Sequence, residues 1–264
     1  MLPDCAARPI DPERPVALLA DLHANFEATM AVDRWLLDQG IEQVVVLGDL
    51  VGYGASPREV IELVAQRRWI CLRGNHEEML LGLAPTTFYA KDRALHAIEW
   101  SARQLAAKHR DFLTALPTAL ELSADVIAVH GSITDPRRCY AYIYDLSLDL
   151  NIRRLTELDA PAGTLVLHGH THRAAVFRVV DGQGSVLSLG ANPILLERGA
   201  WHFVNPGSVG YPRDGDPRSS FFVLHLGART LEAVRLSYDV AASAERIRSA
   251  GYEATLPERL LAAR

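Results

Sequence analysis

The chain begins with three short apolar segments, each followed by polar residues. Val16–Ala20, Gln43–Leu47 and Trp69–Leu72 have the length and composition of buried strands. Between them, Phe26–Asp38 and a segment opened by Pro57 carry apolar residues at helical spacing. Because strands and helices alternate, we expect consecutive strands to run parallel with right-handed crossovers. Ligands of such sheets bind just beyond the carboxyl ends of the strands.

The pattern changes in the second half of the chain. Glu77–Leu116 is predicted to be mostly helical, with an interruption at Pro85. Asp125–Val129 and Thr164–Leu167 are predicted strands, and Leu146–Leu158 is a predicted helix between them. After residue 173, glycine-punctuated apolar segments predict antiparallel strands and a closing helix, over Ala175–Val180, Val186–Leu189, Trp201–Val204, Ser220–Leu226, Leu231–Leu236 and Ala241–Ala250.

Polar side chains suited to metal binding stand where many of the predicted strands end. They occur as Asp-Leu-His, Gly-Asp, Gly-Asn-His-Glu, an isolated His-Gly and Gly-His-Thr-His. Oxygen and imidazole ligands without interleaved cysteine suit a pair of divalent ions such as Mn, Fe, Zn or Ni, whereas a structural zinc site would use cysteine. Two ions that share a carboxylate indicate hydrolysis, most simply of a phosphate ester. The candidates are Asp21, His23, Asp49, Asn75, His76, His130, His170 and His172.

Length and composition are those of a globular protein with an ample core. The chain has 264 residues, of which 49% are hydrophobic and 22% charged. We expect a single domain over residues 1–264, with a flexible segment over residues 1–15 and a mostly helical insertion over residues 77–116. The three cysteines are too few, and odd in number, for a disulfide framework.

Charge and hydropathy narrow the choice of partners. The formal net charge of −5 argues against a surface that coats nucleic acid, which would need a basic stripe. Small phosphorylated substrates, including nucleotides, remain as expected partners. No segment approaches the roughly 20 apolar residues of a membrane helix, so we expect a cytoplasmic protein. The sequence leaves the oligomeric state open.

The order of these motifs resembles the calcineurin-like metallophosphoesterase superfamily, over a stretch from Val16 to about Arg213. The resemblance implies an α/β fold in which two sheets form a β-sandwich flanked by helices, a four-layer αββα arrangement. It also implies a dinuclear metal centre at one end of the sandwich. The apolar pattern is compatible with this fold but does not predict the second sheet by itself.

The resemblance implies a role for each candidate ligand. The first ion would be bound by Asp21, His23 and His172, the second by Asn75, His130 and His170, and Asp49 would bridge them. A hydroxide that bridges the two ions would attack phosphorus in line, so that no serine or cysteine nucleophile is needed.

Residues beside the ligands would complete the reaction. In the family pattern His76 is not a ligand; it would protonate the leaving oxygen, a contribution of about 10²–10⁴-fold. Glu77 would orient it. Arg73 is a candidate contact of a phosphate oxygen; the alternative is an arginine that is salt-bridged or exposed to solvent. Arg213 is a second candidate contact of the substrate. Asn75 is a candidate substrate contact as well as a ligand.

Several alternatives remain open from the sequence. Asn25 either hydrogen-bonds a ligand aspartate or caps the following helix. His168 is either a core histidine or a residue that supports a ligand. Tyr140–Tyr144 forms either a strand face or a loop at the substrate entrance. Residues 205–210, with the sequence Asn-Pro-Gly-Ser-Val-Gly, predict a tight turn that returns to the metal-binding edge.

One departure from a related subclass concerns the residues after Asp49. They read Leu-Val-Gly-Tyr-Gly, in place of the Asp-Arg-Gly with which protein serine/threonine phosphatases grip phosphate. This favours the small bacterial phosphodiesterase and phosphatase branch. The leading hypothesis is therefore hydrolysis of small phosphodiesters or monoesters. The alternatives are a protein serine/threonine phosphatase-like enzyme, a dinucleoside polyphosphate hydrolase and a non-catalytic scaffold.

Overall fold

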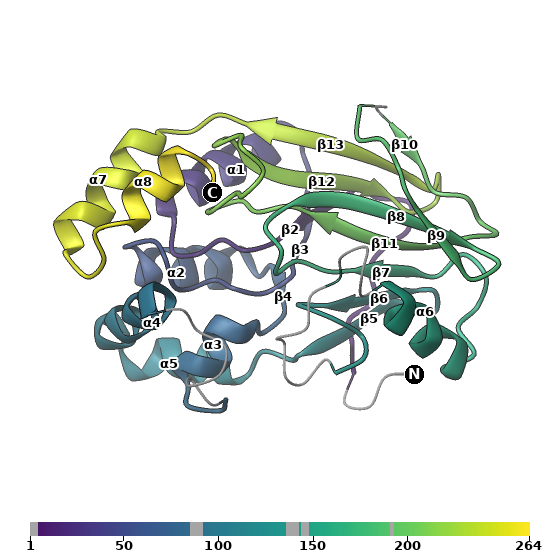
Figure 1. The fold of residues 1–264 in the computed structure, drawn as a ribbon, viewed down its shortest axis with the longest axis horizontal. Helices are drawn as coiled ribbons and strands as arrows, with labels where there is room; N and C mark the ends of the chain where they lie inside the picture. Colours follow the sequence, from purple (N-terminus) through teal and green to yellow (C-terminus); the bar gives the residue numbers. More distant parts are fainter. Residues whose placement is uncertain (1–4, 85–91, 136–142, 144–147, 191–192) are drawn as a thin grey trace.

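The computed structural model describes residues 5–84, 92–135, 143, 148–190 and 193–264 (Figure 1). Its helices are α1 (Phe26–Asp38), α2 (Pro57–Arg67), α3 (Asn75–Leu80), α4 (Asp92–Gln104), α5 (Ala107–Thr114), α6 (Leu148–Glu157), α7 (Val240–Ala250) and α8 (Leu256–Leu261). Its strands are β1 (Ala6–Ala7), β2 (Val16–Leu19), β3 (Gln43–Val46), β4 (Ile70–Cys71), β5 (Ala119–Ser123), β6 (Val126–Val129), β7 (Leu165–Leu167), β8 (Ala174–Val180), β9 (Gln183–Val186), β10 (Ile194–Leu195), β11 (Trp201–Pro206), β12 (Ser219–His225) and β13 (Thr230–Leu236). The longest helices have 13 residues, and none in the described ranges is long and apolar enough to cross a bilayer.

Within the described residues the strands form two mixed sheets, as the resemblance implied. One sheet has seven strands in the order β1-β5-β6-β7-β11-β8-β9, and the other has six in the order β10-β13-β12-β2-β3-β4. The three predicted N-terminal strands are parallel, with Leu18 paired to Val45 and Val46 to Cys71. The connecting helices α1 and α2 have the predicted bounds, because local signals fix them. Asn25 caps α1 by accepting from the Ala28 amide at 3.1 Å, which confirms the capping alternative.

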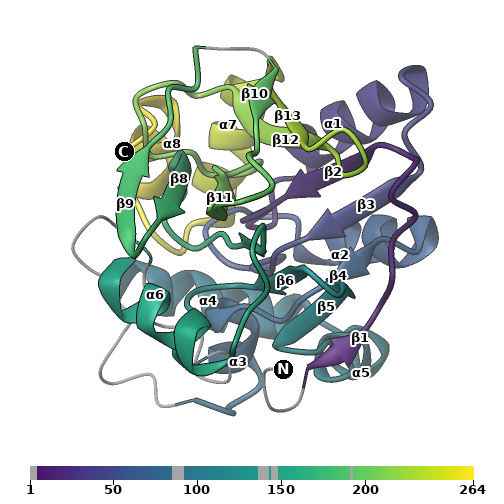
Figure 2. The ribbon, with the colours of Figure 1, turned by 90° about the vertical axis from the view of Figure 1, so that its right-hand side faces the viewer.

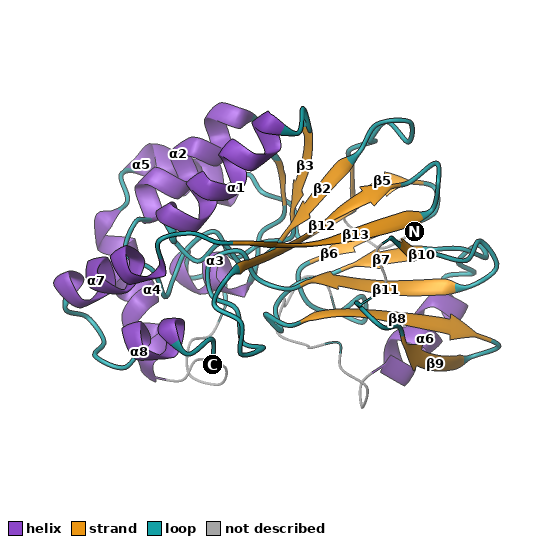
Figure 3. Cartoon of the chain, turned by 90° about the horizontal axis from the view of Figure 1, so that it is seen from above, coloured by secondary structure: helices purple, strands orange, loops and turns teal. Residues whose placement is uncertain are grey.

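Alternating side chains of the strands build a layered core. Leu18 and Val45 pack between the two sheets with Leu165, whereas Leu19 and Val46 point to the opposite face, where α1 and α2 cover the six-stranded sheet. Helix α6 packs on the outer face of the seven-stranded sheet, close to β8 and β9 in Figure 2 and apart from the other helices in Figure 3. Burying each of these leucine or valine side chains contributes about 1.5–3 kcal/mol to stability.

The structure differs from the sequence-based expectation at long-range pairings. β5 was not predicted, and it pairs in parallel with β1 inside the N-terminal segment that we expected to be flexible. Ile10, in the same segment, is buried. Such pairings depend on a partner more than 100 residues away, and two-residue strands such as β1 and β10 leave no periodic signal. The predicted interruption at Pro85 lies outside the described residues.

Candidate metal centre

The loops that follow β2, β3, β4, β6 and β7 converge at one edge of the two sheets. Backbone hydrogen bonds join them: the His23 amide donates to the Asp49 carbonyl at 2.9 Å, and the Gly169 amide donates to the His130 carbonyl at 2.9 Å. β6 and β7 are parallel, as are β2, β3 and β4. The carboxyl ends of strands from both sheets therefore deliver the predicted ligands to one place.

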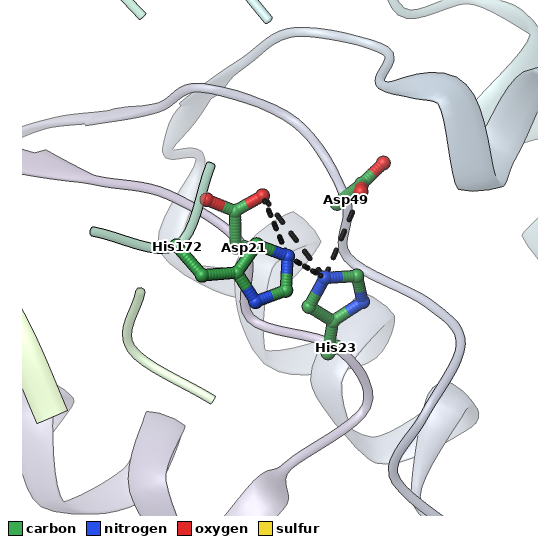
Figure 4. Close-up of side chains that lie close together, drawn as sticks. All are labelled: Asp21, His23, Asp49 and His172. Carbon is green, nitrogen blue, oxygen red and sulfur yellow. Dashed lines mark hydrogen bonds and ion pairs between the residues drawn. The ribbon is translucent and has the colours of Figure 1, made fainter. Parts of the chain in front are cut away.

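One group of side chains comprises Asp21, His23, Asp49 and His172 (Figure 4). His23 Nε2 lies 2.9 Å from His172 Nε2 and 3.6 Å from Asp49 Oδ2. His172 Nε2 lies 3.6 Å from Asp21 Oδ1. The ligand atoms lie within 4.8 Å of one another, and all four residues are buried. One cation could therefore contact all four side chains.

A second group comprises Asp49, His130 and His170. His130 Nε2 lies 3.4 Å from Asp49 Oδ2 and 3.2 Å from His170 Nδ1. It also lies 3.0 Å from Asn75 Oδ1. Asp49 belongs to both groups, and the same oxygen, Oδ2, faces His23 and His130. A carboxylate between two ligand groups is the arrangement that a bridging ligand requires.

Backbone carbonyls fix the orientation of the imidazoles. Three rings donate their Nδ1–H to a carbonyl: His23 to Val51 (3.0 Å), His130 to Leu47 (2.7 Å) and His172 to Tyr211 (2.6 Å). Because a carbonyl only accepts, each neutral ring keeps its lone pair on Nε2. The lone pairs of His23 and His172 thus face each other at 2.9 Å, which is favourable with a cation between them. The donor set fits borderline divalent metals.

The pKa values of the two buried carboxyl groups also favour cations in the cluster. Burial raises the pKa of the Asp21 carboxyl to about 8, and the nearby Asp49 carboxylate adds to the rise. Burial alone would also raise the pKa of Asp49, but the charge of the nearby His130 holds it well below its usual range. Two buried carboxylates can both stay ionised at neutral pH only with cations beside them.

The backbone at the ligands adopts left-handed conformations that L-residues rarely populate. The φ angles are 53° at Asp21, 45° at His23, 56° at Asp49, 69° at His170 and 58° at His172. Each such residue costs about 1–2 kcal/mol relative to the right-handed region. Strain of this kind concentrates at functional sites, where surrounding contacts hold it in place. The conformation turns successive side chains toward the cluster, and no periodic pattern of residues predicts it.

Glu77 supports the loop of Asp49. Its carboxylate accepts from the amides of Asp49 (2.9 Å), Gly74 (2.8 Å) and Val51 (3.1 Å). Burial raises the pKa of Glu77 to about 7. The sequence predicts that Glu77 orients the His76 ring. Among the described contacts, the Glu77 carboxylate binds the backbone that carries Asp49. We therefore infer that Glu77 positions the loop of Asp49.

Glu77→Gln should therefore weaken metal binding. An amide side chain can accept at only one of its two terminal atoms, so at least one of the three backbone amides loses its partner. We expect the affinity for Mn²⁺ to fall by about 10–100-fold. The matched control is Glu78→Gln on the same helix, whose carboxylate receives Arg73 Nε at 2.5 Å. Calorimetric titration checks this, and equal losses in the two variants would contradict the positioning role.

His76 lies beside the cluster and is held by its backbone. Its amide donates to Asp49 Oδ1 at 3.0 Å, and its ring packs edge-on against His23 and Tyr53 at centroid distances of 4.6 and 4.8 Å. Nε2 lies 3.9 Å from Asp49 Oδ2, and Nδ1 has no hydrogen-bond partner in the described part of the chain. Burial lowers the pKa of His76 to about 4, which the Asp49 carboxylate partly opposes.

The two candidate arginines have different surroundings. Arg73 binds Glu78, and its Nη1 donates to the Thr114 carbonyl at 2.9 Å, in accordance with the salt-bridged alternative. Arg213 lies close to the cluster. After burial, its charge is the largest cause that holds the pKa of His172 well below the usual range. Its Nη2 donates to the Tyr53 hydroxyl at 3.1 Å. Among the contacts of the described residues, Arg213 is the one of these two arginines linked directly to a candidate ligand, through its backbone bond to the His172 carbonyl at 3.1 Å.

The predicted turn at residues 205–210 does return to the metal-binding edge. The Gly210 amide donates to the Asp21 carbonyl at 3.0 Å. Asn205 Nδ2 donates to the Gly169 carbonyl at 2.8 Å and to Thr171 Oγ1 at 2.9 Å, and so braces the segment that carries two histidines. The sequence predicts Asn205 only as part of the turn. Its position before Pro-Gly, where Asn side chains bond nearby backbone groups, is the signal for these additional contacts.

Of the two remaining alternatives, the structure describes His168 but not the tyrosine-rich segment. His168 is fully buried, burial lowers its pKa to about 3, and its Nδ1 lies 3.3 Å from Asn205 Nδ2. It is thus a core histidine that also contacts Asn205, the residue that supports the metal-binding loop. Tyr140, Tyr142 and Tyr144 lie outside the described residues.

Comparison with known proteins agrees with this geometry. The sequence profile of the calcineurin-like phosphoesterase superfamily domain matches residues 15–229. The chain belongs to this superfamily. Members of the superfamily are metal-dependent phosphoesterases that act on phosphorylated substrates, and the two ligand groups lie inside the matched region.

Similar proteins match nearly the whole of this chain. An uncharacterised protein of Methanocaldococcus jannaschii is 30% identical over 252 residues, which cover 94% of this chain and 98% of the relative. The crystal structure of a metallophosphoesterase from Sphaerobacter thermophilus is 32% identical, with a TM-score of 0.78 and coverage of 95% and 99%. A hypothetical protein from Pyrococcus horikoshii, 20% identical, shares the fold at a TM-score of 0.73, with coverage of 93% and 97%.

Proposed function

We propose that this protein hydrolyses small phosphodiesters and monoesters, nucleotides among them, with two divalent metal ions. The observation that supports this most is the pair of buried ligand groups that share Asp49 Oδ2. The ions would be held by Asp21, His23 and His172 on one side of Asp49 and by Asn75, His130 and His170 on the other. When bound, they supply Lewis acidity toward phosphoryl oxygens and make water acidic enough to act as a nucleophile at neutral pH.

His76 would donate a proton to the leaving oxygen. Its ring is fixed next to Asp49 by its own backbone hydrogen bond and by packing against Tyr53. A phosphate dianion beside the imidazole raises its pKa, so substrate binding favours the protonated ring that donation requires. Arg213 would contact a non-bridging phosphoryl oxygen, because guanidinium and phosphate form charge-assisted hydrogen bonds.

Gly52→Ala tests the placement of His76. A Cβ at residue 52 would lie 2.1 Å from His76 Nδ1, and φ there is +84°. The control is Gly215→Ala, where φ is +87° and nothing lies within 4 Å of the added carbon. Both variants carry a similar backbone cost, about 1–2 kcal/mol. Only Gly52→Ala should displace the ring, and we expect its kcat on an alkyl phosphate monoester to fall by about 10²-fold. Equal rates in the two variants would contradict the placement.

Metal dependence is the direct test of the proposed function. Purified protein loaded with Mn²⁺ or Ni²⁺ should hydrolyse an aryl phosphodiester or monoester, and a chelator should abolish the activity. A panel of 2′,3′-cyclic and 3′,5′-cyclic nucleotides, dinucleoside polyphosphates, phosphopeptides and simple monoesters then identifies the preferred substrate class. Protein that binds less than one ion per chain after loading and hydrolyses none of these would favour the non-catalytic alternative.

A further inference from the structure

Tyr53 connects the metal-binding side chains with the C-terminal part of the chain. Its ring lies against the rings of His23 and His76, at centroid distances of 4.5 and 4.8 Å. It also stacks on Tyr211 at 4.8 Å, with 29° between the ring planes. Only 8% of Tyr53 is exposed. Because neighbouring rings surround it, the position of its hydroxyl is fixed.

The Tyr53 hydroxyl holds Arg213. Arg213 Nη2 donates to it at 3.1 Å, and Arg213 Cζ lies 5.4 Å from the centroid of the Tyr53 ring. The backbone amide of Arg213 donates to the His172 carbonyl at 3.1 Å. The arginine is therefore tied to a candidate metal ligand at its backbone and to Tyr53 at its guanidinium. An arginine ordered in advance binds an anion with less loss of side-chain entropy.

Tyr53 is itself held by Tyr252. The Tyr252 hydroxyl lies within hydrogen-bond reach of the Tyr53 carbonyl and, at 2.9 Å, of the Gly54 carbonyl. These carbonyls belong to a turn in which Tyr53 has a left-handed φ of 53°. The Tyr252 ring packs on Trp100 of α4, at a centroid distance of 4.9 Å. One hydroxyl between α7 and α8 thus stabilises a strained turn next to the metal centre.

We propose that Tyr252 is a positioning residue for phosphate binding, which fixes Tyr53 and through it the guanidinium of Arg213. The inference rests on the proposed function, since it takes Arg213 as a contact of the phosphoryl group. Tyr252 lies beyond residue 229, where the match to the superfamily domain ends. The C-terminal segment that carries Tyr252 would therefore tune substrate affinity, although it contributes no candidate metal ligand among the described residues.

The side-chain NMR signal of Arg213 follows its position independently of activity. In ¹⁵N-labelled protein, comparison with Arg213→Lys identifies the Nε–H signal. Tyr252→Phe removes only the hydroxyl, and we expect the Arg213 signal to move toward that of a free arginine. The matched control is Tyr238→Phe, which removes a hydroxyl bonded to Asn25 Nδ2 at 3.1 Å and should leave the signal in place. An Arg213 signal in Tyr252→Phe identical to that of the wild type would overturn the inference.

Calorimetric binding of inorganic phosphate to the Mn²⁺-loaded protein measures the consequence. Tyr53→Phe and Tyr252→Phe should each raise the Kd about 3–10-fold, the effect of one hydrogen bond. The double variant should bind no more weakly than Tyr53→Phe alone, because both changes act through the same hydroxyl.

The outcomes separate this inference from the proposed function. Unchanged phosphate affinity in Tyr252→Phe, or additive losses in the double variant, would overturn the inference and leave hydrolysis by the wild type untouched. Wild-type protein that binds metal but neither binds phosphate nor hydrolyses esters would overturn the proposed function instead.

Discussion

Asp49→Asn should lose almost all metal-dependent hydrolysis. The amide keeps the size of the side chain and can still accept from the His76 backbone amide, as Asp49 Oδ1 does at 3.0 Å. It removes the negative charge that both ligand groups share at Oδ2. Loss of several kcal/mol of transition-state stabilisation corresponds to a fall in kcat/KM on the order of 10³-fold. The bound metal should also drop below two ions per chain.

A buried aspartate away from the cluster provides the control for this variant. Asp33 on α1 is 2% exposed and binds Arg67 at 2.7 Å. Asp33→Asn should lower the melting temperature while leaving the metal content and the rate unchanged. Metal content and kinetics of both variants are measured on the same loaded preparations. Full activity with two bound ions in Asp49→Asn would show that Asp49 does not bridge.

His76→Ala should separate metal binding from proton transfer. The His76 side chain belongs to neither ligand group, so we expect two ions per chain to remain. The rate should fall by about 10²–10⁴-fold on alkyl monoesters, whose leaving oxygen needs a proton. On aryl diesters with good leaving groups the fall should be much smaller.

The alkyl monoester and the aryl diester serve as internal controls for His76→Ala. Because both are hydrolysed at the same metal centre, a general disturbance of the site lowers both rates together. Steady-state kinetics with a series of leaving groups measures the difference. Equal losses on all substrates would argue against His76 as the proton donor and for a role in arranging the Asp49 loop.

Elements with local signals could be predicted from the sequence. Helix α1 begins at Phe26 because Asn25 caps it, and α2 begins at Pro57, which has no amide to lose at the first helical position. The strand–helix alternation predicted three parallel strands, and the structure has them. β1 was not predicted, because its partner β5 is distant in the sequence. β5 was also missed, although it pairs antiparallel with the neighbouring predicted strand β6.

The residue types of the candidate site could be predicted from the sequence, but its geometry could not. The ligand motifs bear carboxylates and imidazoles that the fold brings into two groups around Asp49. The carbonyls that orient these imidazoles come from loops whose conformation has no sequence signature, such as Leu47 for His130. The backbone contacts of Glu77 and the link from Tyr252 through Tyr53 to Arg213 likewise exist only in three dimensions.

Anomalous diffraction from crystals of the Mn²⁺-loaded protein tests the central claim most directly. The account predicts two manganese peaks roughly 3.5–4 Å apart, with the carboxylate of Asp49 bound to both. The first ion should also contact His23 and His172, and the second His130. A single peak, or two ions that share no ligand at Asp49, would contradict the account.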